Sequence, residues 1–126
     1  MRVILLIAFG SALGGVARYL VSGFMAERVG EAFPWGTLLV NVVGSALIGV
    51  LAGLEDAVRV GFPPEARQFL MVGVLGGFTT FSAFSLQTLR LLHTGDWQRA
   101  GGNVLLSVCA CLVAVALGYR LARMAA

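Results

Sequence analysis

Four long apolar segments make up most of this chain, and they limit its possible folds more than any other feature. The segments cover about residues 3–25, 35–54, 66–92 and 100–121, with short polar loops between them. A helix needs about 20 apolar residues to cross a bilayer, so each segment is long enough to do so. In a chain of 126 residues that is 59% hydrophobic and 12% charged, four crossings leave no room for a soluble domain. The sequence therefore predicts an all-α integral membrane protein in which residues 1–126 form one four-helix domain.

The middle of the third segment, Gly73 to Phe84, reads GVLGGFTTFSAF and combines glycines with hydroxyl side chains. Glycine lowers the cost of leaving helical geometry, and Thr and Ser can bond backbone groups that lose their helical partners. In a bilayer, such backbone persists only where it is buried in protein or lines a watery cavity. We therefore expect the third helix to break in mid-membrane, with Gly76 to Thr79 unwound and the helix resuming at Phe81. The break predicts a partner surface, a bound ion or a pore.

Small and polar residues form a stripe on each of two other predicted helices. The second-segment stripe advances by three or four residues, which keeps it on one helical face. Its members are Thr37, Asn41, Gly44, Ser45 and Ile48. In the fourth segment the residues that recur every four positions are Asn103, Ser107 and Cys111. Interhelical hydrogen bonding explains either stripe alone, whereas the match between the two favours a polar pore.

The first segment contributes a glycine pair and a charge. Gly10 and Gly14 have the GxxxG spacing that lets two helix backbones approach closely. Arg18 lies about 22 Å along a helix that begins at residue 3, near the far edge of the hydrocarbon layer. Its guanidinium either reaches the interface by snorkelling or is a buried charge that attracts an anion or ties helices together. The sequence leaves both interpretations open.

Several function classes are excluded by what the sequence lacks. The six acidic residues all fall in loops or at segment ends, and no phosphate loop, nucleophile with its base or Cys/His metal spacing occurs. We therefore expect no enzyme, and the absence of a mid-membrane carboxylate argues against proton-driven export. The basic residues, all arginine, are dispersed rather than clustered, so nucleic acid is not an expected partner. Cys109 and Cys111 point to nearly opposite sides of a helix and cannot bridge each other.

The distribution of arginines gives little information about orientation in the membrane. With four crossings, one side carries Arg2, Arg59, Arg67, Arg120 and Arg123. The other side carries Arg28, Arg90 and Arg99, with Arg18 near it. The positive-inside rule depends on a bias between the sides, and this bias is close to zero. We therefore expect insertion in both orientations, which would permit an antiparallel dimer.

Two phenylalanines are placed to contribute to an anion path. Phe81 and Phe84 are three residues apart and share one side of the helix that resumes after the expected break. Because aromatic ring edges are electropositive, rings presented edge-on can contact a small anion, and the Asn41 amide can replace part of its lost hydration. The alternative is that both rings face lipid or the core.

Three motifs resemble the Fluc-type fluoride channels, the camphor-resistance B family. They are GSALGGVARY at residues 10–19, GTLLVNVVGS at residues 36–45 and GVLGGFTTFSAFS at residues 73–85. The resemblance extends over the whole chain in length, span count and motif order. It implies a fluoride-selective channel that passively exports fluoride across the bacterial plasma membrane. It also implies a dual-topology homodimer of antiparallel subunits embedded in lipid.

The resemblance also implies roles for individual residues. Asn41 would be the pore asparagine, Phe81 and Phe84 the aromatic ladder facing fluoride, and Arg18 the first-helix arginine. A polar track would include Thr37 and Ser107, with Asn103 and Cys111 at positions where the family varies. The backbone carbonyls of Gly76 and Thr79 would hold a structural sodium ion, Na+, on the dimer axis.

Two other functions stay open beside the channel. A small multidrug-resistance-type exporter would need a carboxylate in its first span, and residues 3–25 contain none. A membrane assembly protein without transport activity would use its glycine stripes only for packing and would carry no ion flux. The sequence also leaves open whether the chain pairs with itself or with an unlike chain.

Overall fold

The computed structural model describes residues 1–57 and 61–126, and over these residues it contains helices and no strand. Within the described residues, four helical segments are long and apolar enough to cross a membrane. They are Arg2–Val29, Trp35–Ala57, Pro64–His93 and Trp97–Ala125. The predictions of an all-helical fold and of four membrane-spanning segments are confirmed. Arg59, which entered the comparison of the two membrane sides, lies outside the described residues.

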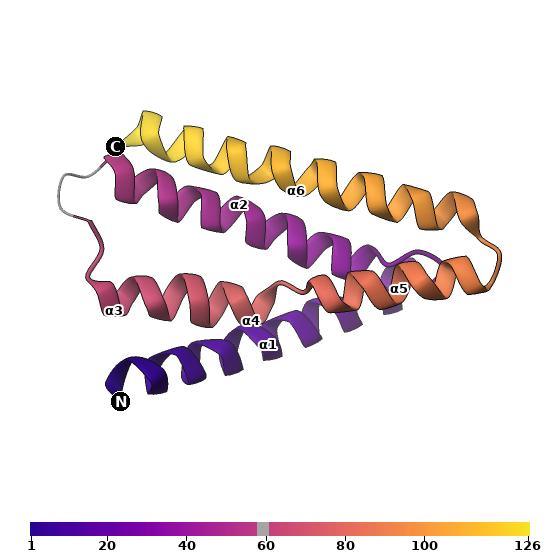
Figure 1. The fold of residues 1–126 in the computed structure, drawn as a ribbon, viewed down its shortest axis with the longest axis horizontal. Coiled ribbons are helices and arrows are strands. Elements are labelled where there is room, and N and C mark those ends of the chain that lie inside the picture. The colour runs from indigo at the N-terminus through magenta and orange to yellow at the C-terminus, as the bar shows by residue number, and fades with distance from the viewer. Residues whose placement is uncertain (58–60) are drawn as a thin grey trace.

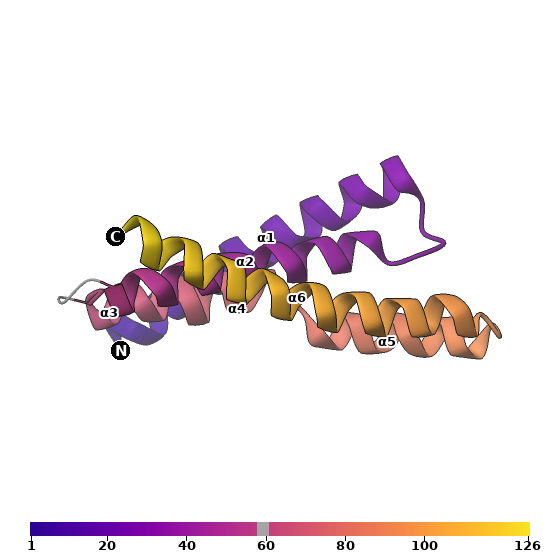
Figure 2. The same ribbon diagram turned by 90° about the horizontal axis from the view of Figure 1, so that it is seen from above.

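The elements are α1 (Arg2–Val29), α2 (Trp35–Ala57), α3 (Pro64–Arg67), the π-helix η1 (Gln68–Leu75), α4 (Gly76–Phe78), α5 (Phe81–His93) and α6 (Trp97–Ala125). The elements from α3 to α5 form one membrane segment, and successive membrane segments run in opposite directions (Figure 1). Both termini, the end of α2 and the start of α3 lie at one end, and the α1–α2 and α5–α6 connections lie at the other. Seen from above, the α1–α2 pair and the α5–α6 pair diverge toward that second end (Figure 2).

The third segment changes its backbone geometry four times. Its first part passes from α3 into the π-helix η1, and α4 ends at Phe78. Thr79 (φ −83°, ψ 157°) and Thr80 (φ −153°, ψ 113°) are extended, and α5 begins at Phe81. Gly76 is helical (φ −63°, ψ −37°), and α4 continues through Gly77 to Phe78. The expectation that residues 76–79 are unwound is therefore wrong for residues 76–78. The extended backbone lies at the threonines, two and three residues beyond Gly77.

Glycines instead allow α1 to pack directly on the third segment. A Cβ atom on Gly14 would collide with the carbonyl oxygen of Val74, and one on Gly10 would lie 2.8 Å from the carbonyl oxygen of Phe69. From the other side, a Cβ atom on Gly77 would lie 2.5 Å from the carbonyl oxygen of Ser11. The close approach predicted from the GxxxG spacing is therefore confirmed. Gly77 serves this contact rather than an unwound turn.

The same device joins α2 to α6, which pack along their lengths. A Cβ atom on Gly49 would collide with the carbonyl oxygen of Val115. A Cβ atom on Gly118 would collide in the same way with the carbonyl oxygen of Ala46. Lipid tails are as apolar as the side chains, so the hydrophobic effect does not bring membrane helices together. Small residues instead favour association by letting the backbones approach closely. The close packing of α2 against α6 therefore fixes the positions of the polar residues on both helices.

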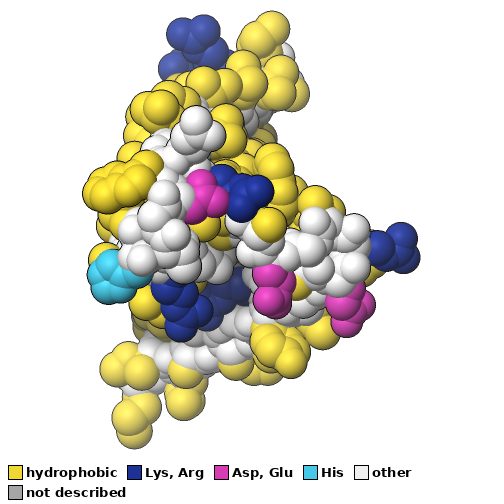
Figure 3. Space-filling model, turned by 90° about the vertical axis from the view of Figure 1, so that its right-hand side faces the viewer, with side chains coloured by type: hydrophobic (Ala, Val, Ile, Leu, Met, Phe, Trp, Pro, Cys, Tyr) yellow, Lys and Arg dark blue, Asp and Glu magenta, His cyan; other side chains and the backbone are white. Residues whose placement is uncertain are grey.

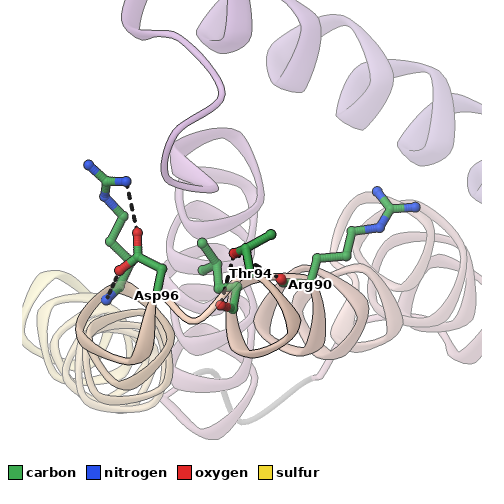
Figure 4. Close-up of polar contacts among 5 residues, drawn as sticks. Arg90, Thr94 and Asp96 are labelled. Atoms are coloured by element: carbon green, nitrogen blue, oxygen red, sulfur yellow. Dashed lines mark hydrogen bonds and ion pairs between the residues drawn. The ribbon is translucent and has the colours of Figure 1, made fainter.

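Hydrogen bonds close the turn between α5 and α6 (Figure 4). The Thr94 hydroxyl donates to the carbonyl oxygen of Arg90 at 3.2 Å, and Gly95 has the positive φ of 78° that favours glycine. Asp96 caps α6 by accepting from the backbone N–H of Arg99 at 3.1 Å. The Asp96 carboxylate also forms an ion pair with the Arg99 guanidinium at 2.9 Å. This exposed ion pair stabilises the turn by at most about 1 kcal/mol.

The surface combines exposed apolar side chains with charged ends. Large hydrophobic residues are exposed along the helices, among them Phe9 on α1 and Leu112 on α6. Arginine, acidic and histidine side chains gather among apolar ones at the end that carries the α1–α2 and α5–α6 connections (Figure 3). This is the pattern of a chain whose helix sides contact lipid and whose ends contact water.

Candidate functional site

Two cavities among the described residues are relevant to function, and we call them the inner and the outer cavity. The inner cavity has a volume of about 400 Å³ and lies between α2, the middle of the third segment and α6. Its polar and aromatic lining residues are Asn41, Ser45, Thr79, Thr80, Phe81, Phe84, Ser107 and Cys111. No charged side chain of the described residues lines it. The outer cavity, about 980 Å³, lies at the end where the helix pairs diverge.

Asn41 holds the extended backbone of the third segment. Its Oδ1 accepts a hydrogen bond from the backbone N–H of Thr80 at 2.7 Å, and its Nδ2 donates to the carbonyl oxygen of Thr80 at 3.0 Å. One side chain on α2 thus satisfies both backbone groups of a residue outside helical geometry. Because a side-chain amide has two N–H groups, one donor of Asn41 is left over. Asn41 therefore acts as an interhelical brace and still lines the inner cavity.

The two threonines use their hydroxyls on neighbouring backbone. The Thr80 hydroxyl accepts from the backbone N–H of Ala83 at 3.2 Å, which caps the start of α5. The Thr79 hydroxyl donates to the carbonyl oxygen of Leu75 at 2.9 Å. The Thr79 methyl group sits where a Cβ atom on Gly44 would be, so Gly44 on α2 leaves the space that this threonine fills.

These bonds leave two backbone carbonyls free of the donors that a continuous helix would give them. In such a helix the N–H of Thr80 would reach the Gly76 oxygen, but it bonds to Asn41. The N–H of Ala83 would reach the Thr79 oxygen, but it bonds to the Thr80 hydroxyl. Both Gly76 and Thr79 line the inner cavity. Carbonyl oxygens are hard ligands of the kind that bind small cations, so these two are the candidate cation ligands of the site.

Phe81 and Phe84 share one side of α5, as their spacing predicts. Their ring centroids are 5.2 Å apart and the ring planes are tilted by 44°. Phe84 is buried, with 8% of its surface exposed, whereas Phe81 is 76% exposed although it also lines the inner cavity. A ring pair that continues from a buried to an open position can extend the cavity lining to the edge of the molecule.

On α6, only two members of the predicted stripe reach the inner cavity. Ser107 and Cys111 line it, and Cys111 is a free thiol. Asn103 is 1% exposed and lies behind the wall, where its Nδ2 donates to the Thr88 hydroxyl at 2.9 Å. Its Oδ1 accepts from the Ser107 hydroxyl at 3.3 Å. Asn103 thus connects α6 to α5 and does not itself line the cavity.

Two further candidates lie away from the inner cavity. Thr37 is 6% exposed and lines the outer cavity, four residues before Asn41 on the same face of α2. Arg18 lines neither cavity and forms no ion pair with any residue that the structure describes. Its sequence neighbour Tyr19 is part of the outer cavity wall.

Sequence reasoning missed the pairing of Thr80 with Asn41 and the contact of Thr88 with Asn103. Thr80 is the partner of Asn41 and caps α5. The sequence indicated only that Thr and Ser side chains near the break can bond to backbone groups. Thr88 lies four residues after Phe84 and seven after Phe81, so it shares their helical face. That spacing was the available signal for Thr88.

Comparison with known proteins agrees with this architecture. Residues 5–119 match the family described as "CrcB-like protein, Camphor Resistance (CrcB)". A protein of Opitutus terrae is 59% identical over 122 residues, which cover 94% of this chain and 91% of that protein. A protein of Methylocella silvestris is 58% identical over 116 residues, which cover 90% of this chain and 87% of that protein. A protein of Shewanella woodyi is 46% identical over 121 residues, which cover 96% of each chain.

All three relatives carry the name "Fluoride-specific ion channel FluC". The family match covers most of the chain and includes the segments that supply Asn41, the two threonines and the phenylalanine pair. The chain belongs to the CrcB-like, camphor-resistance family.

Proposed function

We propose that this protein is a fluoride-selective ion channel, and that it passively exports fluoride from the cytoplasm across the bacterial plasma membrane. The observation that carries the proposal is 59% identity, over nearly the full length, to a relative named as a fluoride-specific channel. Four apolar helical segments make it a multi-pass membrane protein. Passive movement of an ion requires no covalent chemistry, so the protein is a channel and not an enzyme.

The inner cavity supplies the chemistry for the fluoride path. Fluoride holds its water tightly, so a path must replace that hydration with strong donors in a narrow space. The spare N–H of Asn41 and the electropositive ring edges of Phe81 and Phe84 are such groups, and Ser107 lines the same cavity. A wall without carboxylates does not repel an anion.

The outer cavity is the proposed mouth of this path. Thr37 lies on its wall on the same α2 face as Asn41, which joins the two cavities along one helix. Arg18 lies next to Tyr19 of that wall, and Arg90 lies on the wall itself together with the carboxylates of Glu27 and Glu31. The two arginines offset these two acidic charges at the mouth. Asn103 completes the polar track from behind Ser107.

The active unit is proposed to be an antiparallel homodimer. Phe81 is 76% exposed while its ring partner Phe84 is buried, so one chain covers only part of the aromatic pair. A second copy covers the remainder, and the nearly equal arginine count on the two sides permits opposite insertion. The extended residues Thr79 and Thr80 then form a break of the third span in mid-membrane, buried in protein as a bilayer requires.

A structural sodium ion fits the free carbonyls beside this break. Gly76 and Thr79 present backbone oxygens whose helical donors are bonded elsewhere. In an antiparallel dimer, two such pairs would give four hard oxygen ligands on the two-fold axis. When bound, the ion supplies positive charge that holds the two broken spans together.

Fluoride efflux from liposomes that contain the purified protein tests the proposal. The expected result is rapid fluoride efflux, read with a fluoride electrode, and no chloride efflux under the same gradient. Equal efflux of both anions would contradict selectivity. No efflux of either would favour a membrane assembly protein.

Two further measurements separate the remaining alternatives. A multidrug exporter would move organic cations against a proton gradient, which the liposomes can also test. Topology can be tested with a single cysteine introduced at the N-terminus and labelled from outside the cell. Cys109 and Cys111 are first replaced by serine. Opposite insertion predicts about half labelling, and complete or absent labelling would contradict the antiparallel dimer.

A further inference from the structure

A line of hydrogen bonds leads from the inner cavity into the packing between α5 and α6. Ser107 lines the cavity, and its hydroxyl donates to Asn103 Oδ1 at 3.3 Å. Asn103 Nδ2 donates to the Thr88 hydroxyl at 2.9 Å, and that hydroxyl donates to the carbonyl oxygen of Phe84 at 2.8 Å. In this direction, the single proton of Ser107 points away from the cavity. Only lone pairs of the Ser107 oxygen then face an anion, which they repel.

The same three side chains can form the line in the opposite direction. An amide oxygen and an amide nitrogen occupy nearly the same space, so a half-turn of the Asn103 side chain keeps both distances. Thr88 then donates to Asn103 Oδ1, Asn103 Nδ2 donates to the Ser107 oxygen, and the Ser107 proton is free for the cavity. Phe84 lies inside α5, so its carbonyl keeps the helical N–H bond when the Thr88 hydroxyl turns away.

Burial limits the Asn103 amide to these two directions. Asn103 is 1% exposed, so water does not compete for its oxygen or its nitrogen. Leaving either group unpaired at such a site is costly, and each direction pairs both groups. An anion at Ser107 favours the reversed direction, because that direction alone gives the anion a proton to bind.

We propose that Thr88, Asn103 and Ser107 form a reversible hydrogen-bond relay, in which the direction of the Asn103 amide decides whether Ser107 offers a proton or a lone pair to an anion. The relay rests on the proposed function, since it needs fluoride in the inner cavity. Ser107 contacts the ion, whereas Asn103 and Thr88 are positioning residues that act through it. Without the amide, the Ser107 hydroxyl bonds to the carbonyl oxygen four residues back, as serines in membrane helices commonly do.

A double-mutant cycle on fluoride efflux from liposomes tests the relay. We expect Asn103→Leu and Ser107→Ala each to lower the efflux rate about threefold to tenfold, the effect of one hydrogen bond. The double variant should be no slower than Ser107→Ala alone, because Asn103 acts only through the Ser107 hydroxyl. If Asn103 acted only through packing, Asn103→Leu would also slow efflux in the Ser107→Ala protein. The rate reductions of the two single variants would then multiply in the double variant.

Further variants separate the relay from general damage to the fold. Ser85→Ala is the matched control, because the exposed Ser85 hydroxyl bonds to the Phe81 carbonyl and lies in neither cavity; it should keep the original rate. Thr88→Val should lower the rate and Thr88→Ser should retain it, because only the hydroxyl is needed. If Asn103→Leu does not assemble on size-exclusion chromatography, Asn103→Ala replaces it without added bulk.

The outcomes distinguish the relay from the function on which it rests. Absence of fluoride efflux from the unaltered protein would overturn the proposed function and the relay with it. Normal efflux of the unaltered protein with multiplying effects of Asn103→Leu and Ser107→Ala would overturn the relay alone. Fluoride efflux through Asn103→Leu at the rate of the unaltered protein would also overturn the relay alone.

Discussion

The side chain of Asn41 on α2 pairs with both backbone groups of Thr80, accepting from its N–H at 2.7 Å and donating to its carbonyl oxygen at 3.0 Å. The pairing makes Asn41 the substitute for the helical neighbours that Thr80 lacks. It also diverts the Thr80 N–H from the Gly76 carbonyl. One residue therefore fixes the extended backbone, leaves the Gly76 carbonyl without its helical donor and lines the inner cavity.

Asn41→Asp should abolish fluoride efflux. The carboxylate can still accept from Thr80 N–H, but it cannot donate to the Thr80 carbonyl oxygen, and it adds a negative charge to an otherwise uncharged wall. We expect the loss of the donor to destabilise the protein by about 1–3 kcal/mol, as is typical when a buried partner is left unpaired. Efflux from liposomes and thermal unfolding in detergent measure the two effects. Efflux at the original rate from an assembled Asn41→Asp protein would show that the path avoids Asn41.

Phe81→Ile should slow fluoride efflux strongly while the protein still assembles. The ring is 76% exposed in a single chain, so its loss costs the packing of that chain little, whereas the path loses an aromatic edge. Phe9→Ile is the control, because Phe9 is also exposed, at 62%, and lines neither cavity. Paired efflux measurements on the two variants decide the matter, and equal rates would mean that Phe81 has no special role.

Gly44→Ala should impair the protein, and Thr79→Ser should repair it. The new Cβ atom would collide with the Thr79 methyl group, which we expect to cost about 1–3 kcal/mol. Thr79→Ser removes that methyl and keeps the hydroxyl that bonds to the Leu75 carbonyl. Thermal unfolding of the single and double variants measures the repair.

Gly15→Ala provides the control for this pair, because a Cβ atom on Gly15 meets nothing within 4 Å. It should leave stability unchanged or raise it, since alanine favours helix over glycine. A double variant as unstable as Gly44→Ala would mean that the contact with Thr79 is not the cause.

Replacing sodium by a large organic cation should lower fluoride efflux and the melting temperature of the assembled protein. The Gly76 and Thr79 carbonyls lack their helical donors, so without a cation they lose a partner inside the membrane. Efflux and thermal unfolding in sodium and in N-methylglucamine solutions measure the change. Identical values in both solutions would argue against a structural sodium ion.

The sequence by itself determined the number of membrane segments and the faces on which their polar residues lie. Both follow from local properties, namely the length of each apolar run and the helical period. On α2, Asn41, Gly44, Ser45 and Ile48 line the inner cavity together, as the predicted stripe requires. The GxxxG spacing of Gly10 and Gly14 likewise predicted a close helix contact.

The tertiary structure decided which polar residues meet and where the helical backbone becomes extended. Glycines at positions 76 and 77 permit an extended turn, but Gly77 packs against α1, and the extended backbone lies at the threonines, where Asn41 supplies a donor and an acceptor. Asn103 belongs to the predicted α6 stripe, yet its amide donates to the Thr88 hydroxyl on α5 and does not line the inner cavity. In each case a hydrogen-bond or packing partner distant in sequence determines the outcome, and local pattern carries no information about such partners.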